Sequence, residues 1–241
     1  MKTTIYKSNA RGFANHGWLN AHHYFSFAGY FNPERIQFGA LRVLNDDIIQ
    51  GGTGFGEHPH DNMEIITIPL KGDLHHKDSM NNEWIKLSVD EVQVMSAGTG
   101  LIHAEKNANS DEELSLFQIW IFPNQQNATP RYDQKKFDKE LRINQLQKLV
   151  ASFNDEDSSA LKIHQNAKIS RIELSENQEF VYELMDCKNG VFVLLVDGTI
   201  RINQELLSSR DAVAISETEK FTIQIKEKSD ILFIEVPIEL Y

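Results

Sequence analysis

Short apolar runs, some of them alternating strictly with polar residues, recur along most of this chain and predict strands. Residues 64–70, 91–95 and 114–122 form such runs, and each is followed closely by a glycine or a proline that would end a strand. Alternation with a period of two is typical of a strand with one buried face. The same rhythm returns at residues 191–196 and 231–236, which are mostly apolar. We therefore predict an all-β protein.

The two halves of the chain repeat one order of elements. In each half an apolar strand is followed by a turn with glycine, a return strand, a polar loop and a further apolar strand. This rhythm predicts a duplicated jelly-roll β-barrel. We expect an N-terminal domain at residues 1–125 and a C-terminal domain at residues 161–241. Residues 126–160 are polar, and we interpret them as an inter-domain segment with a short helical or irregular piece around residues 133–140.

Charge and composition exclude several classes of protein. Lys and Arg number 24 against 35 Asp and Glu, which gives a net charge of −11. An acidic surface repels phosphate backbones, so we expect no direct binding to nucleic acid. The apolar runs are too short to span a membrane, and no signal-peptide core is present near the first residue. The single cysteine, Cys187, excludes an internal disulfide, and we expect a cytoplasmic protein.

Two short runs carry the chemistry of this chain. Residues 57–60 read Glu-His-Pro-His and residues 103–105 read His-Ala-Glu, so each run places two ligand-type side chains two residues apart. On a strand such residues leave the same face, about 6.5 Å apart along it. Two such pairs on facing strands could surround one ion with three imidazoles and one carboxylate. This ligand set is typical of a transition metal.

The spacing around these runs resembles the two sequence signatures of cupins. The first is matched by Gly52, His58, His60, Glu64 and Gly72, and the second by Gly100, His103 and Asn107. Three departures weaken the general match. The interval from Glu64 to Gly72 is one residue longer than usual, and Gly98 and Val92 stand where cupins usually have Pro and Gly.

One cupin subfamily accounts for these departures. Residues 54–60 (GFGEHPH) and 95–105 (MSAGTGLIHAE) resemble the pirin family, and residues 11–19 and 129–132 point the same way. Together they resemble the bacterial pirin-like quercetin 2,3-dioxygenases. The resemblance is dense over about residues 6–137 and thinner but continuous beyond them.

The resemblance implies a bicupin monomer in which only the N-terminal barrel binds a metal. The implied ligands are His58, His60, His103 and Glu105, whereas Glu64, the usual fourth cupin ligand, is not one of them. Ala104 stands where the family often has Ser. The resemblance favours Fe²⁺, and the same ligand set also suits Ni²⁺, Cu²⁺, Zn²⁺, Mn²⁺ or Co²⁺.

The implied activity is oxidative cleavage of a flavonol such as quercetin, with O₂ consumed and carbon monoxide released. Glu105 is then the candidate base for the substrate hydroxyl group. Two other classes of function stay open at this point. One is a non-enzymatic metal-binding regulator that senses redox state and acts through protein partners. The other is a cupin isomerase or small-molecule binder.

Several other polar residues invite an interpretation. Only one of His75 and His76 can face a barrel interior, because they are neighbours on a strand. We expect the aromatic and histidine residues at positions 16–27 to pack as a lid or to line the mouth of the site. We expect Asp46-Asp47 to form a strand-end turn, and Arg42 to pair with acidic neighbours.

Overall fold

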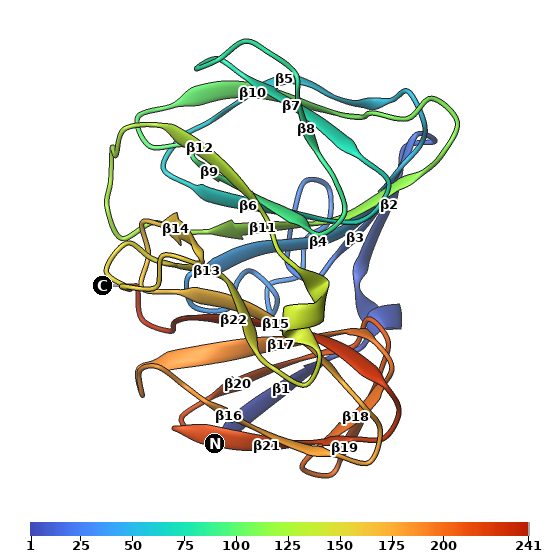
Figure 1. Ribbon diagram of the computed structural model, residues 1–241, viewed down its shortest axis with the longest axis vertical. Helices are drawn as coiled ribbons and strands as arrows, with labels where there is room; N and C mark the ends of the chain where they lie inside the picture. The colour runs from blue at the N-terminus through green and yellow to red at the C-terminus, as the bar shows by residue number, and fades with distance from the viewer. Residues whose placement is uncertain (241) are drawn as a thin grey trace.

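A computed structural model describes residues 1–240 and contains four layers of β-sheet (Figure 1). Each half of the fold has one seven-stranded and one four-stranded sheet, and the two seven-stranded sheets face each other in the middle. Two short 3₁₀ turns, η1 (Ser8–Ala10) and η2 (Lys139–Arg142), are the helical elements of the described residues. None of these residues forms a helix long and apolar enough to cross a membrane. The all-β prediction is confirmed.

The N-terminal sheets are antiparallel throughout. The larger sheet has the order β12-β9-β6-β11-β4-β3-β2, and the smaller has the order β5-β10-β7-β8. The strands of the larger sheet span, in that order, Arg131–Lys136, Glu91–Ser96, Glu64–Lys71, Leu114–Ile121, Leu41–Ile49, Leu19–His23 and Gly12–Asn15. Those of the smaller sheet span Gly54–His60, Leu101–Asn107, Leu74–Asp78 and Ile85–Leu87.

The C-terminal sheets have the orders β1-β20-β17-β22-β15-β13-β14 and β16-β21-β18-β19, and they repeat this plan except that β13 and β14 are parallel. The strands of the larger sheet span Lys2–Tyr6, Ala212–Ser216, Asn189–Asp197, Ser229–Pro237, Lys168–Leu174, Gln147–Ser152 and Leu161–Ile163. Those of the smaller sheet span Glu179–Glu183, Lys220–Ile225, Thr199–Ile202 and Glu205–Ser208. The duplicated order of elements in the sequence therefore corresponds to a duplicated pair of sheets.

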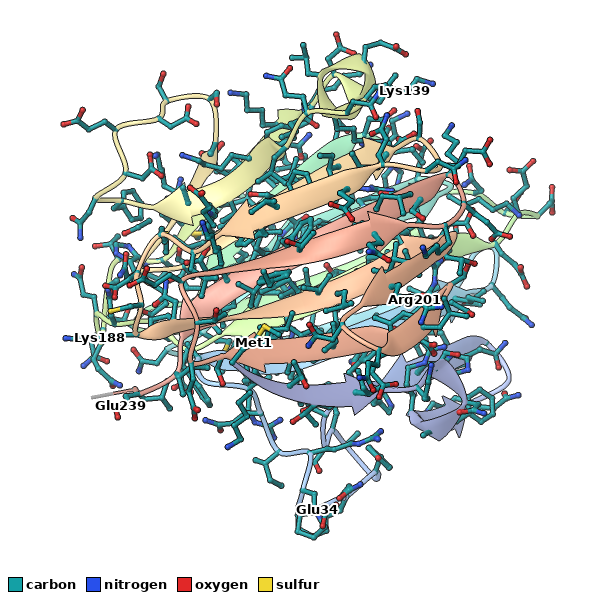
Figure 2. The ribbon with its side chains drawn as sticks, turned by 90° about the horizontal axis from the view of Figure 1, so that it is seen from below. Met1, Glu34, Lys139, Lys188, Arg201 and Glu239 are labelled. Carbon is teal, nitrogen blue, oxygen red and sulfur yellow. The ribbon has the colours of Figure 1, made fainter. Side chains whose placement is uncertain are left out.

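The first strand departs from the expected division at residues 1–125. β1 pairs with β20 and so completes the C-terminal seven-stranded sheet, with Tyr6 opposite Ala212. Figure 2 shows this strand, in blue, beside the orange strands of the C-terminal half. Tyr6 is buried and packs edge-to-face on Phe192, with 5.0 Å between the ring centroids. Burial of this aromatic contact holds the first strand on the second domain.

The expected inter-domain segment, residues 126–160, is mostly divided between the two domains. β12 pairs with β9 of the N-terminal domain, and β13 pairs with β15 of the C-terminal domain. The expected helical piece is reduced to η2, where Asp138 accepts a hydrogen bond from the backbone N–H of Glu140 at 3.0 Å. β12 is an edge strand without a fully buried side chain, so its polar composition hid it from the hydrophobic pattern.

The two sandwich interiors are filled differently. In the C-terminal domain apolar side chains such as Ile172, Val193 and Phe233 form one continuous core between the sheets. In the N-terminal domain the apolar side chains form two smaller clusters, one around Leu114 and one around Met95. The space between these clusters holds polar residues and a cavity. The N-terminal barrel therefore has an interior suited to a metal and a ligand, whereas the described interior of the C-terminal barrel is filled by apolar side chains.

Candidate metal centre

Three histidines meet inside the N-terminal sandwich. β5 and β10 are antiparallel neighbours, and their register places His58 opposite His103. His60 lies two residues further along β5, on the same face as His58. The ring centroids of the three imidazoles are 4.3–4.9 Å apart, and the Nε2 atoms of His58 and His103 are separated by 2.9 Å. The i, i+2 spacing in the sequence thus produces a compact group of nitrogen ligands.

The state of these histidines fits a transition-metal ion. Nε2 of His60 and Nδ1 of His103 are buried and have no hydrogen-bond partner among residues 1–240. Burial lowers the pKa of His60 to about 4 and that of His103 to about 3, so both imidazoles are neutral near pH 7. A neutral imidazole with a free nitrogen lone pair is the form that binds a metal. One nitrogen from each of His58, His60 and His103 lies within 4.8 Å of the others.

Glu105 lies beside this group on β10, and its carboxylate is buried. Gln118 donates a hydrogen bond to its Oε2 at 2.7 Å, and the hydroxyl group of Thr67 lies 3.5 Å from its Oε1. Burial alone would raise the pKa of Glu105, but His76 and the neighbouring imidazoles bring it below its ordinary value. Its nearest potential co-ligands are His76 and His103, with which it forms a second group of close ligand atoms. Glu105 is therefore an ionised carboxylate at the edge of the histidine group.

Of the two neighbouring histidines on β7, His76 is the one that faces the interior. It is fully buried, and its Nε2 lies 3.1 Å from the carboxylate of Asp78. Its ring stacks on Tyr132 of β12, with 4.8 Å between the centroids. His76 Nδ1 lies 3.9 Å from Glu105 Oε1 and 3.4 Å from Nε2 of Gln93, so the imidazole lies between Asp78 and Glu105. The alternation of residues along the strand predicted one inward histidine, but nothing in the sequence identified these partners.

A polar row that sequence reasoning missed crosses the floor of the site. Neighbouring strands β3, β4, β11, β6 and β9 are paired so that one polar residue of each lies opposite the next. The row consists of His23, Asn45, Gln118, Thr67 and Gln93. His23 and Asn45 are hydrogen-bonded at 2.8 Å, while Gln118 and Thr67 approach Glu105. Thr67 and Gln118 interrupt largely apolar strands, but the row as a whole follows only from the register between the strands.

A cavity of about 900 Å³ opens beside the histidines. His58, His60, His103 and Glu105 all line it. Its other walls are rich in aromatic side chains, namely Phe13, Trp18, Phe27, Tyr30, Phe55 and Trp120, and also contain aliphatic and polar residues such as Leu19 and Asp47. Trp120 connects the walls to the metal ligands, because it packs edge-to-face on both His60 and Phe27 at centroid distances of 4.8 and 5.3 Å. Of the N-terminal stretch, Trp18 and Phe27 line the site, which was one of the two expected arrangements. Tyr24 and Phe25 do not, because they are buried in the core between the two seven-stranded sheets.

Two expectations about charged residues are wrong. Asp46 and Asp47 do not form a strand-end turn, because both lie within β4 and are buried. Asp46 is stabilised by ion pairs with Arg11 at 2.9 Å and Arg210 at 3.1 Å, and the pair with Arg210 ties β4 to the C-terminal domain. Arg42 does not pair with an acid, since its guanidinium group donates hydrogen bonds to two backbone carbonyls, those of residues 26 and 36.

Glu64 lies apart from the close ligand groups. Its carboxyl group is buried and accepts a hydrogen bond from Ser96 at 2.7 Å. Burial raises the pKa of Glu64 to about 7. Neither group of close ligand atoms includes this residue. The expectation that Glu64 is not a metal ligand stays a prediction.

Comparisons with known proteins agree with this geometry. Residues 6–121 match the family model described as Pirin, and residues 149–236 match that described as Quercetinase C-terminal cupin domain. A quercetin 2,3-dioxygenase of Escherichia coli K12 is 42% identical over 231 residues, which cover 96% of this chain and 97% of the relative. A pirin-like protein of Caulobacter vibrioides is 38% identical, covering 93% of this chain and 95% of its own length.

Solved structures of bacterial pirins also resemble this chain. The crystal structure of YhhW from E. coli superposes with a TM-score of 0.92 at 39% identity, covering 98% of each chain. A second structure, of bacterial pirin YhhW in complex with nickel(II), gives a TM-score of 0.91 at 38% identity, covering 98% of this chain and 99% of that one. The two-cupin prediction is thereby confirmed, and the histidine group identifies the N-terminal domain as the metal-binding one. This chain belongs to the pirin family.

Proposed function

We propose that this protein is a metal-dependent dioxygenase that cleaves a flavonol such as quercetin with O₂ and releases carbon monoxide. The observation that carries the proposal is the cavity of about 900 Å³ with aromatic walls, which opens directly on three histidines. This volume is typical of small-molecule sites. The name of the E. coli relative, quercetin 2,3-dioxygenase, supports the same activity.

The proposed ligands of the ion are His58, His60, His103 and Glu105. We propose one divalent transition metal, with Fe²⁺ as the resident ion on the basis of the family resemblance, while the ion in the E. coli YhhW complex is nickel(II). A bound ion would supply positive charge that stabilises the anion of a substrate hydroxyl group. Three imidazoles and one carboxylate leave coordination positions free on a five- or six-coordinate ion.

The walls of the cavity suit a flat aromatic ligand. Trp120 and Phe27 present rings near His60, and Trp18 and Phe55 form a second aromatic pair with 5.1 Å between centroids. Aromatic faces and edges pack favourably on the rings of a flavonol and keep water away from it. A regulator that acts through protein partners needs a recognition surface, so a cavity of this kind favours an enzyme over that alternative.

Glu105 is the proposed base. Its pKa lies below the ordinary value, so the carboxylate is ionised at neutral pH and can accept the proton of a substrate hydroxyl group. The hydrogen bond from Gln118 fixes the direction of its Oε2. Gln118 therefore positions the carboxylate, and Glu105 receives the proton. We also propose that the protein works as a monomer in the cytoplasm, where its exposed Cys187 would stay reduced.

The experiment is an anaerobic preparation loaded with Fe²⁺ or Ni²⁺, mixed with quercetin and then with O₂. The expected result is loss of quercetin absorbance with matched uptake of O₂ and release of carbon monoxide. Glu105→Gln should nearly abolish turnover while only part of the bound metal is lost. Elemental analysis of protein purified without added metal identifies the resident ion. Binding of metal without any loss of quercetin would contradict the proposed activity.

A further inference from the structure

Asp47 is an acidic residue in the cavity wall, and its Oδ1 atom accepts no hydrogen bond from residues 1–240. The residue lies in β4, lines the cavity beside the metal ligands and is 3% exposed. Its Oδ1 atom has no hydrogen-bond partner among residues 1–240. The residues opposite it on the two neighbouring strands are Ala21 and Leu116, whose side chains are apolar and buried. The sheet around Asp47 therefore supplies no side-chain donor at these two positions.

The neighbouring polar residues form ion pairs or hydrogen bonds within the protein, whereas Oδ1 of Asp47 forms none among residues 1–240. Asp46, one residue earlier, is paired with two arginines at the domain interface. Asn45, two residues earlier on the same face, is hydrogen-bonded to His23. Gln118 donates its hydrogen bond to Glu105. A buried polar group without a partner costs about 1–3 kcal/mol, so a group of this kind in a cavity wall is suited to bind something that enters the cavity.

The protonation of Asp47 is compatible with this use. Burial, with the charges of Asp46 and Glu105, raises the pKa of Asp47 to about 8. A neutral carboxylic acid both donates and accepts hydrogen bonds. A second unsatisfied polar atom in the cavity wall, Nε1 of Trp120, offers a further donor. The cavity thus combines aromatic walls with hydrogen-bonding groups that the protein itself leaves unused.

We propose that Asp47 binds a ring hydroxyl group of the aromatic ligand and thereby selects hydroxylated flavonols over unsubstituted ones. The ligand class in this inference rests on the proposed function. The role of Asp47 is in binding and selection, and it is separate from the proton transfer assigned to Glu105. A phenol suits this position because its hydroxyl group, like the acid, can donate one hydrogen bond and accept another.

The test compares two flavonols with the nickel-loaded protein in the absence of O₂, so that no turnover occurs. Quercetin carries several ring hydroxyl groups, whereas 3-hydroxyflavone carries only the one at position 3. Binding is measured by quenching of tryptophan fluorescence, because Trp18 and Trp120 both line the cavity. Asp47→Ala should weaken quercetin binding by about tenfold and leave the affinity for 3-hydroxyflavone within about twofold. Asp47→Asn, which keeps a donor and an acceptor, should retain most of the affinity for quercetin.

If Asp47→Ala only disturbed the fold, the variant would lose stability, nickel or affinity for both flavonols. Nickel content should be unchanged in Asp47→Ala, and the midpoint of thermal unfolding should not fall, since the Oδ1 atom makes no hydrogen bond within the protein. Asp47→Val removes the same group while filling the space, and it replaces the alanine variant if that variant unfolds. Equal losses of affinity for both flavonols, or no loss for quercetin, would overturn the role of Asp47.

The same titrations separate this inference from the proposed function. If the wild-type protein binds and cleaves quercetin but Asp47→Ala has the same selectivity, only the role of Asp47 is refuted. If the wild-type protein binds neither flavonol, the proposed function and this inference both fail.

Discussion

Gln118 donates a hydrogen bond of 2.7 Å to Glu105 across the interior of the N-terminal sandwich. Gln118 lies on the seven-stranded sheet and Glu105 on the four-stranded sheet, so this bond connects the two layers at the site. A hydrogen bond to a carboxylate favours its charged form. The same contact therefore fixes the carboxylate in space and helps to keep it ionised.

Replacing Gln118 with Leu should shift the acid limb of the activity profile to higher pH. Loss of the donor raises the pKa of Glu105, so the carboxylate is protonated at a higher pH than in the wild-type protein. A charge-assisted hydrogen bond is worth about 1.5 kcal/mol or more, which corresponds to a shift of about one pH unit. The measurement is kcat/KM for quercetin against pH.

The matched control is Gln224→Leu. Gln224 donates a hydrogen bond to Glu179 at 3.2 Å on the exposed surface of the C-terminal domain. This variant should leave the activity profile unchanged. An unshifted acid limb in Gln118→Leu would show that the amide does not control the charge of Glu105.

Each of His58→Ala, His60→Ala and His103→Ala should reduce nickel affinity strongly. Each variant removes one of three nitrogen ligands that lie within 4.8 Å of one another. The loss should exceed the 10–100-fold that is typical for removal of a residue that only supports a ligand. Calorimetric titration with Ni²⁺ measures the affinity. His75→Ala is the control, because His75 lies on the neighbouring strand β7 and belongs to neither ligand group. The His75→Ala variant should bind Ni²⁺ as tightly as the wild-type protein does.

Glu64 should make the protein less stable as the pH rises. Its pKa is about 7 in the folded state, against 4.5 for the free side chain, because burial disfavours the charged form. Between these two values the folded state binds more protons than the unfolded state, so the free energy of unfolding falls with increasing pH. The contribution is complete below pH 4.5 and lost above about pH 7.

The variant Glu64→Gln removes this dependence. Urea unfolding of both proteins from pH 4.5 to 8 gives the difference in stability at each pH. The wild-type protein should lose stability relative to Glu64→Gln up to about pH 7, after which the difference should stay constant. A difference that does not change with pH would mean that Glu64 titrates normally.

Gly98→Ala should destabilise the turn that precedes β10. Gly98 has a φ of +49°, and a Cβ atom at this position would collide with the carbonyl oxygen of Ala128. Backbone strain of this kind costs about 1–3 kcal/mol. Thermal unfolding measures the effect. Gly29→Ala is the control, because no heavy atom lies within 4 Å of its Cβ position and its φ is not positive, so its midpoint should match that of the wild-type protein.

Local pattern was enough to predict many of the strands and the pairing of His58 with His60 on one strand face. The apolar runs at residues 64–70 and 114–122 became β6 and β11 because burial on a sheet requires that pattern. His58 and His60 could be paired because alternation along a strand is a purely local property. The convergence of His103 on them depended on pairing between β5 and β10, which the family resemblance supplied and the spacing alone did not.

The failures share a cause, which is tertiary contact without a local signal. Asp46 and Asp47 resemble turn residues, yet ion pairs with Arg11 and Arg210 keep Asp46 buried within β4. The polar row on the floor of the site is visible only after the strands have been placed in register. The pairing of β1 with β20 joins segments from opposite ends of the sequence, so no window of neighbouring residues contains it.

The pairing of β1 with β20 also affects how the protein is made. The ribosome produces β1 long before its partner β20, because most of the described chain lies between them. Until then Tyr6 has no strand to lie against, and the edge of β1 that later pairs with β20 is open to other chains. The nascent N-terminal barrel therefore carries an unpaired strand throughout elongation, and a prematurely terminated product would be prone to aggregate. The C-terminal seven-stranded sheet is complete only when β20 has been made and β1 has paired with it.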